Sequence, residues 1–379
     1  VAGAVKMQGA RRCGVALVEA SNNVCLFGGS GFPATGGDGY LNDLWKYDPV
    51  LNQWAWMKGS NAINQSGTYG PKGLAVPSNC PGGREFPAVW KDPAGAVWIF
   101  GGGGYPAGFS PGHLNDLWRF NTTTNNWIYQ SGTNLVNQIG NNGTLGVPST
   151  TNIPGARYSA AQVFDNWGNL WLFGGIGYPG TFGIGRLNDM WKYTPGTDEW
   201  TWMKGFNGVN ANGTYGTMGV SAPANNPGGR YYNIGWKDLN GDMWLFGSFG
   251  YPATGPLNNL NDLWKFKITC APFDITDAFG LNLCNGDSTT LSVATVSSNI
   301  VTWYNSLTST VSLGTGNTFT TPALATGNYT FYAEGSPCTM RVPITVSVSA
   351  CTKVNEFGVR GSELVVYPNP NNGSFFIRS

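Results

Sequence analysis

Short apolar runs, separated by segments rich in Gly, Asn and Pro, repeat along most of the chain. One such run, Val97–Phe100, ends in two glycines, and Trp118 and Trp127 mark later runs of the same unit. The spacing is fixed at 73 residues, as two series show: Phe27, Phe100, Phe173, Phe246 and Trp45, Trp118, Trp191, Trp264. A long fixed period is typical of repeat architectures in which each unit packs on its neighbours. The pattern therefore predicts four related units between about residues 9 and 267.

Each unit is expected to contain four antiparallel strands. In the second unit the apolar segment Phe86–Trp90 is followed by the turn Asp92–Gly95 and then by Val97–Phe100. Asp at the first position and Gly at the last predict a type I turn with a bulge, which joins antiparallel strands. The Trp118 and Trp127 segments supply the third and fourth strands. Four antiparallel strands are the content of one propeller blade, so the sequence predicts an all-β propeller.

The double glycine after the second strand, the Tyr or Trp in the third and the Trp in the fourth resemble the kelch family. This resemblance covers about residues 9–267 and implies a kelch-like β-propeller over residues 1–267. The units are longer than usual kelch units in two places. These are the loop between the second and third strands (101–113, 174–186) and the loop between units (57–83, 130–156, 203–229). Because strand direction alternates, both loops are expected on one face, here called the loop face, where binding sites usually lie.

Ring closure is a separate question. Kelch propellers generally contain more than four blades, and the fourth unit has no Trp-x-Trp segment after Phe266. We therefore expect the four units to be part of a larger ring in a longer protein. A four-bladed ring is the alternative.

The repeat ends near residue 267, and a different β pattern follows. Alternating apolar and polar positions predict strands at 289–294, 300–304, 329–333 and 341–348. The Val-Thr-Trp-Tyr run and the late Gly-Asn-Tyr-Thr-Phe-Tyr run resemble an immunoglobulin-like module over residues 268–352. Four of the seven cysteines lie here, which favours an oxidising, extracellular compartment. The first candidate pairs are Cys284–Cys338 and Cys270–Cys351, and other pairings stay open because connectivity cannot be deduced from sequence.

The end of the chain carries a specific motif. Residues 353–379 contain Tyr367, Pro368, Asn369, Pro370 and Gly373, which resemble the start of the C-terminal sorting domain of the Bacteroidetes type IX secretion system. The resemblance implies the type IX machinery as a partner. It also implies a location outside a Gram-negative bacterium or on its outer-membrane surface. Ser288, within Asp-Ser-Thr, resembles the O-glycosylation sites of these bacteria.

Composition narrows the function classes. The formal net charge is +1 and only 11% of residues are charged, which argues against a nucleic-acid partner. No apolar run approaches the roughly 20 residues that span a bilayer, so no direct membrane insertion is expected. His113 is the single histidine. Serine-type triads and His-rich zinc sites need positioned imidazoles, so we predict no catalytic residue, metal site or cofactor.

Repeated aromatic residues are the best binding candidates. One set lies between Gly and Pro on the loop face, and a second lies in the interblade loops: Phe32, Tyr105, Tyr178, Tyr251 and Tyr69, Tyr215. Such side chains stack on sugars and anchor protein interfaces, although packing on their own blade is the alternative. His113 is a further candidate because the other units carry Tyr40, Arg186 and Asn259 there. The repeated arginines at 11, 84, 157 and 230 are instead expected to pair with the aspartates at 43, 116, 189 and 262.

The sequence as a whole predicts a secreted or surface-exposed binding or adhesion protein rather than an enzyme. Its loop face would recognise a glycan or a protein. The alternatives are a structural component of an extracellular layer or filament and a carbohydrate-active enzyme that uses Asp, Glu and Tyr of the same face.

Overall fold

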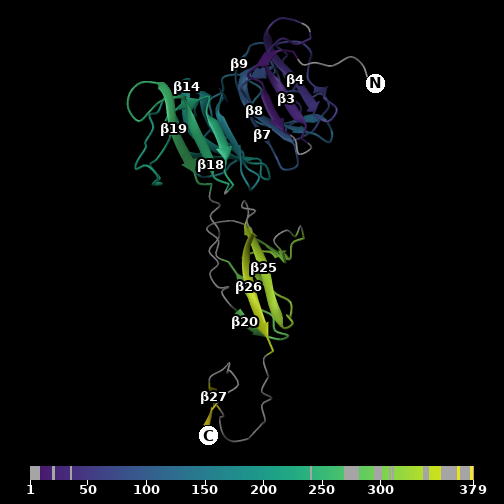
Figure 1. Cartoon of the computed structure of the whole chain (residues 1–379), viewed down its shortest axis with the longest axis vertical. Helices are drawn as coiled ribbons and strands as arrows, with labels where there is room; N and C mark the ends of the chain where they lie inside the picture. The colour runs from purple at the N-terminus through teal and green to yellow at the C-terminus, as the bar shows by residue number, and fades with distance from the viewer. Residues whose placement is uncertain are drawn as a thin grey trace. The chain divides into compact units, whose positions relative to one another are not determined.

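The structure is a computed structural model of the chain. It describes residues 9–18, 22–34, 36–239, 241–268, 281–293, 301–306, 309, 311–335, 341–350, 365–367 and 376–378. The chain divides into two compact units, Val1–Cys270 and Ala271–Ser379. All regular elements within these described ranges are β-strands (Figure 1), which confirms the predicted all-β fold.

The first unit contains four blades of antiparallel strands. Blade 1 has β1 (Arg11–Arg12), β2 (Val15–Val18), β3 (Val24–Gly31), β4 (Gly39–Asp48) and β5 (Gln53–Lys58). Blade 2 has β6 (Arg84–Glu85), β7 (Ala88–Lys91), β8 (Val97–Gly104), β9 (Gly112–Asn121) and β10 (Asn126–Ser131). Blade 3 has β11 (Arg157–Tyr158), β12 (Ala161–Phe164), β13 (Leu170–Gly177), β14 (Gly185–Thr194) and β15 (Glu199–Lys204). Blade 4 has β16 (Arg230–Tyr231), β17 (Ile234–Lys237), β18 (Met243–Gly250) and β19 (Asn258–Phe266).

The innermost strand of every blade is interrupted, whereas the sequence predicts one continuous strand from Phe86. The interrupting residues share a left-handed backbone, with φ between 51° and 59°: Cys13, Phe86, Ser159 and Tyr232. The Phe86 amide donates to the Cys13 carbonyl (3.0 Å), and the series continues with Ser159 to Phe86 (3.1 Å) and Tyr232 to Ser159 (3.2 Å). These bonds join successive blades, so the unusual conformation serves blade-to-blade contact and splits each inner strand in two.

The double glycine lies inside the sheet rather than at its end. Gly101 has φ of 64°, and a Cβ there would meet the Arg157 carbonyl oxygen of the next blade at 2.6 Å. The ladder between β8 and β9 shifts register between Phe100 and Gly102 and then resumes to Gly104 and Gly112. Glycine is therefore required for close approach of two backbones, and the strands extend into the predicted loop 101–113.

Arginine–aspartate pairs tie the inner strand of each blade to its third strand, as predicted. In blade 2 the Arg84 nitrogens Nη1 and Nη2 donate to Asp116 Oδ1 and Oδ2, both at 2.7 Å, and Nη1 also donates to the Gly101 carbonyl. Equivalent pairs join the other blades: Arg11–Asp43, Arg157–Asp189 and Arg230–Asp262. The bidentate geometry satisfies both buried charges, so the repeated arginines are structural.

Aromatic and aliphatic residues from neighbouring blades form the core of the first unit. Phe100 packs edge to face on Trp200 of the next blade at 5.3 Å, and Phe27 packs in the same way on Trp127. Blade 4 differs. Its Phe246 is 44% exposed, whereas Phe173 at the same repeat position is 1% exposed. Within the described ranges, β19 also lacks an outer neighbouring strand.

The second unit contains two small sheets. The larger has the order β20 (Leu281–Cys284), β26 (Arg341–Ser349), β25 (Gly327–Gly335), β22 (Val301–Tyr304) and β23 (Gly314–Thr315). The smaller pairs β21 (Thr290–Ser292) with β24 (Thr318–Thr320). Their shared core surrounds the fully buried Trp303. Separately, β27 (Val365–Tyr367) pairs with β28 (Phe376–Arg378).

Two sets of predicted residues in the second unit are only partly described. Cys284 is disulfide-bonded, while Cys270, Cys338 and Cys351 lie outside the described residues, so both candidate pairings stay predictions. Tyr367 ends β27. The remaining motif residues Pro368, Asn369, Pro370 and Gly373 also lie outside the described residues.

Candidate functional site

Residues that differ between the blades gather in one pocket at the loop-bearing end of the inner strands. The pocket has a volume of about 340 Å³ and is called the inner-strand pocket below. Its lining residues are Tyr40, Glu85, Phe86, Gly103, Gly104, Pro111, Gly112, His113, Tyr158 and Tyr232. The volume lies within the range of small-molecule sites. These residues come from all four blades, because the inner strands are neighbours in succession.

Three of the repeat positions that line this pocket carry a different side chain in most blades. One position carries Tyr40, His113, Arg186 and Asn259, and another carries Arg12, Glu85, Tyr158 and Tyr231. The position of Phe86 carries Cys13, Ser159 and Tyr232 in the other blades. By contrast, the Arg–Asp pairs next to the pocket are identical in all four blades. Scaffold contacts therefore do not dictate the side chains of the pocket.

Aromatic rings form most of the pocket wall. Phe86 packs against Tyr232 with ring centroids 5.1 Å apart and against Tyr158 at 6.2 Å. Tyr40 makes an edge-to-face contact with Tyr105 at 5.9 Å. Tyr232 is 51% exposed, so its ring is available to a ligand from solvent.

His113 belongs to this aromatic wall. Its ring stacks on Tyr158 at 5.0 Å with an interplanar angle of 12°, and Tyr178 meets it edge to face at 5.7 Å. Its Nδ1 lies 3.3 Å from Asn137 Oδ1. Burial lowers the pKa of His113 below its ordinary value, so the imidazole is neutral at pH 7.

Glu85 is the carboxylate of the pocket. Across the described part of the chain, its side chain makes no hydrogen bond or ion pair. Burial raises the pKa of Glu85, the charge of Arg12 lowers it and the charge of Asp38 raises it. Arg12 itself pairs with Asp38 at 3.1 Å and is largely exposed. The pocket therefore holds an acidic group whose acceptor atoms are not used by the fold.

The predicted Gly-aromatic-Pro residues have their backbones fixed by hydrogen bonds, and two of them contact residues of this site. Each backbone amide donates to the carbonyl of the residue just before the inner strand of its own blade. The pairs are Tyr105 to Gly83, Tyr178 to Ala156 and Tyr251 to Gly229. Tyr105 and Tyr178 contact the pocket residues Tyr40 and His113. Phe32 is 53% exposed. The structure thus brings Tyr105, Tyr178 and His113 together, and their role in binding stays a prediction.

Tyr69 and Tyr215, the predicted binding residues of the interblade loops, instead contact the Arg–Asp pairs. The Tyr69 hydroxyl donates to Asp116 Oδ2 at 2.6 Å, and the Tyr215 hydroxyl donates to Asp262 Oδ2 at 2.6 Å. Their rings pack on Trp118 and Trp264. Burial, together with the neighbouring carboxylate, raises the pKa of Tyr215 to about 12. Both tyrosines therefore complete the Arg–Asp contacts and are left out of the site proposed below.

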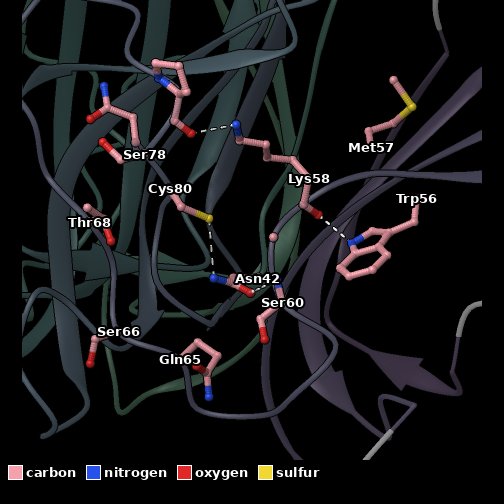
Figure 2. Close-up of a pocket in the computed structure, with 13 residues that line it drawn as sticks. Asn42, Trp56, Met57, Lys58, Ser60, Gln65, Ser66, Thr68, Ser78 and Cys80 are labelled. Carbon is pink, nitrogen blue, oxygen red and sulfur yellow. Dashed lines mark hydrogen bonds between the residues drawn. The ribbon is translucent and has the colours of Figure 1, made fainter.

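A second pocket of about 500 Å³ lies beside the loop between blades 1 and 2 (Figure 2), and is called the interblade pocket. Several of its polar side chains are hydrogen-bonded within the fold. Asn42 Nδ2 donates to the Pro81 carbonyl and contacts Cys80 Sγ at 3.5 Å, and Lys58 Nζ donates to the Pro77 carbonyl at 2.8 Å. The Trp56 indole donates to the Lys58 carbonyl. Equivalent bonds recur in blade 3, where Lys204 donates to the Pro223 carbonyl and Trp202 to that of Lys204.

Other predicted groups do not form a site. Over the described residues, no group of three or more His, Cys, Asp or Glu is arranged to hold a metal ion. No helix in those residues is long and apolar enough to cross a membrane. Ser288 is exposed in the connection between β20 and β21, and its glycosylation stays a prediction.

Sequence reasoning identified His113 but missed Tyr40, Glu85, Phe86, Tyr158 and Tyr232. The signal that selected His113 was its variation between matched units, and the same signal was present at these positions. What makes it informative here is that three variable positions meet in one place.

Comparisons with known proteins support the two architectures. A model described as "Kelch motif" matches residues 11–61, and one described as "Ig-like domain CHU_C associated" matches residues 274–349. No curated protein matches the chain. One similar solved structure is titled "Structure of YjhT", at 14% identity and a TM-score of 0.38, covering 68% of this chain and 81% of that one.

Another is titled "Novel fungal alcohol oxidase with catalytic diversity among the AA5 family, in complex with copper". It has 13% identity and a TM-score of 0.35, and covers 90% of this chain and 76% of that chain. At these scores neither structure carries an argument about function. The chain is thus all-β: it contains a kelch motif in a propeller-like fold and, separately, an immunoglobulin-like domain. This combination is typical of binding and adhesion proteins.

Proposed function

We propose that this protein is a secreted or cell-surface binding protein, exported by the type IX secretion machinery. Its inner-strand pocket recognises a glycan or a protein partner. The observation that carries the proposal is the convergence of non-repeated side chains on one pocket, which is lined by aromatic rings and holds a carboxylate without a partner among the described residues. The immunoglobulin-like domain acts as a spacer, and the residues from Tyr367 to Gly373 act as the sorting signal.

Binding fits this pocket better than catalysis. Glu85 has no second carboxylate lining the pocket, and His113 holds its ring between Tyr158 and Tyr178. General acid–base chemistry on a sugar usually needs a pair of carboxyl groups. Aromatic walls with a few convergent polar groups are instead the ordinary composition of recognition sites.

The test uses the full chain on a glycan array and on intact cell envelopes. The variant Gly103→Ile places a side chain in the pocket, where an added Cβ would meet only Glu85 Cγ, at 4.0 Å. Gly196→Ile is the matched control, because its added Cβ would meet nothing and it lies in a turn of blade 3 outside the pocket. We expect saturable binding that Gly103→Ile abolishes and Gly196→Ile preserves. Equal binding by all three proteins would contradict the proposal.

A structural role in an extracellular layer is a second candidate, favoured by the open face of blade 4. Large apolar residues are exposed there that have buried counterparts in blades 2 and 3, among them Phe246 and Leu263. Such patches commonly mark interaction surfaces. Sedimentation over a range of protein concentrations, with Phe246→Asp alongside, tests this role. Assembly that the variant prevents would support it.

A further inference from the structure

One lining position of the inner-strand pocket carries glycine where the other blades carry a side chain. Gly103 occupies the repeat position of Ser30, Ile176 and Phe249. The Gly103 backbone does not adopt a left-handed conformation, and a Cβ there would meet only Glu85 Cγ, at 4.0 Å. Glycine is therefore not needed at this position for the backbone. Its effect is to leave space in front of Glu85.

The other blade junctions show which side chains face the repeat position of Glu85. At the junction of blades 3 and 4, the Arg186 guanidinium lies over the Tyr231 ring at 5.5 Å. At the junction of blades 2 and 3, the His113 ring stacks on Tyr158. The equivalent residues at the junction of blades 1 and 2 are Tyr40 and Glu85. Here the protein supplies an aromatic ring and a carboxylate but no cation.

Among the described residues, no cation forms an ion pair with Glu85. Arg12, the cation that acts on Glu85, forms its ion pair with Asp38. His113 is neutral at pH 7. The carboxylate is also close enough to the phenols of Tyr40, Tyr158 and Tyr232 that its charge adds to burial in raising their pKa values. One negative charge is thus surrounded by aromatic rings.

We infer that the inner-strand pocket binds an organic cation, an ammonium group carried by the partner, with Glu85 as its counter-ion. The rings of Tyr40, Phe86 and Tyr232 form the walls around it. Aromatic faces attract alkylammonium groups through their quadrupoles, and a carboxylate adds direct charge complementarity. This inference rests on the proposed function and specifies the chemistry of its ligand. An anionic ligand would be repelled by Glu85, and a neutral sugar would leave its charge unpaired.

The first experiment compares two probes of the same shape on the full chain. Choline carries a quaternary nitrogen, and its isostere dimethylbutanol carries carbon at that place. Titration followed by NMR or calorimetry gives both affinities. We expect choline to bind about tenfold or more tightly than dimethylbutanol, which corresponds to the scale of a desolvated cation–π contact. Equal affinities would overturn the inference.

Three variants locate the effect. Glu85→Gln keeps the size of the side chain and should reduce the preference for choline by about tenfold or more. Gly103→Ile should abolish binding of both probes, and Gly196→Ile should change neither. Circular dichroism and thermal unfolding establish that each variant is folded. A Glu85→Gln protein that is folded and keeps the full preference for choline would show that Glu85 is not the counter-ion.

Two further probes distinguish the sources of the ammonium group. Nα-acetyl-lysine amide, which keeps its side-chain ammonium group, represents a protein partner, and glucosamine represents an amino sugar of a glycan. The tighter probe indicates the class of partner. If envelope binding depends on Gly103 but neither amine nor choline binds, the cation inference fails and the proposed function stands. If choline binds but no envelope or glycan does, the proposed function fails and the pocket chemistry stands.

Discussion

The inner-strand pocket and the interblade pocket are built from different kinds of repeat position. The interblade pocket is lined by residues whose contacts recur in another blade, and its amide, ammonium and indole groups bond to nearby carbonyls. Several side chains that line the inner-strand pocket change from blade to blade, and the Glu85 carboxylate has no hydrogen-bond or ion-pair partner among the described residues. The larger pocket is therefore part of the scaffold, whereas the smaller one has groups free for a ligand. In a repeat protein, pairing and repetition of the lining side chains are more informative than pocket size.

The first test, with the largest expected effect, removes a contact that is repeated in every blade. Asp189→Ala leaves the buried Arg157 guanidinium without its counter-ion and the Trp191 indole without the acceptor that it contacts at 2.7 Å. We expect a loss of about 3–5 kcal/mol in the free energy of unfolding, measured by urea denaturation, because an unpaired charge stays buried. Asp38→Ala is the control, since its pair with Arg12 is exposed and should cost below about 1 kcal/mol. Similar losses in both variants would contradict the structural role of the repeated pairs.

The second test compares one repeat position in two blades. Phe173→Ala should cost about 3–5 kcal/mol, because the side chain is fully buried between blades. Phe246→Ala should cost about 1 kcal/mol or less, because that side chain is already exposed. Both values come from denaturant unfolding of the full chain. An equal cost at Phe246 would show that another surface covers the blade 4 face in solution.

The third test measures how the affinity of the inner-strand pocket for choline depends on pH. Burial raises the pKa of Glu85, so its carboxylate loses its charge at a higher pH than a free glutamate does. Affinity for choline should therefore fall as pH decreases through that raised pKa, and it should not change over the same range in Glu85→Gln. The other charged or titratable groups near Glu85 are Arg12, Cys13, Asp38, Tyr40, His113, Tyr158 and Tyr232. His113 should not contribute above its lowered pKa.

The raised pKa of Glu85 also predicts how this residue affects the stability of the fold. Because the folded-state pKa of Glu85 lies above the unfolded value, the ionised carboxylate disfavours folding at neutral pH, and this penalty disappears below the unfolded pKa. Glu85→Gln should therefore leave stability at pH 7 unchanged or slightly increased, as measured by the unfolding midpoint. A clear loss would mean that Glu85 has a structural partner.

The smallest effect concerns the interblade pocket. Burial raises the pKa of the Cys80 thiol to about 11, and the charges of Lys58 and Arg84 only partly oppose this. At pH 8 the thiol should react slowly with iodoacetamide in the native protein and much faster in denaturant. Peptide-level mass spectrometry identifies the labelled cysteine. Rapid native labelling of Cys80 would show that the pocket opens, and would weaken its assignment to the scaffold.

Much of the fold could be predicted from the sequence because its signals are local and repeated. The 73-residue step, the Asp-x-x-Gly turns and the alternating apolar runs depend on neighbouring residues, and repetition in four units reinforced each of them. The Arg–Asp pairs also followed from repetition. The breaks in the inner strands did not, since the left-handed backbone at Phe86 and Ser159 is favoured by hydrogen bonds to the adjacent blade. Nor could the sequence show that β8 and β9 continue past the double glycine.

The candidate site shows the same division. The β architecture, the loop face, the immunoglobulin-like pattern and the variable repeat position of His113 could all be predicted from the sequence. The tertiary structure alone decided that His113 stacks on Tyr158 and that Glu85 faces the rings of three other blades. It also decided that Gly103 leaves the space between them. The physical reason is that these residues lie on different strands, most of them in different blades, and only tertiary packing brings them within reach of one ligand.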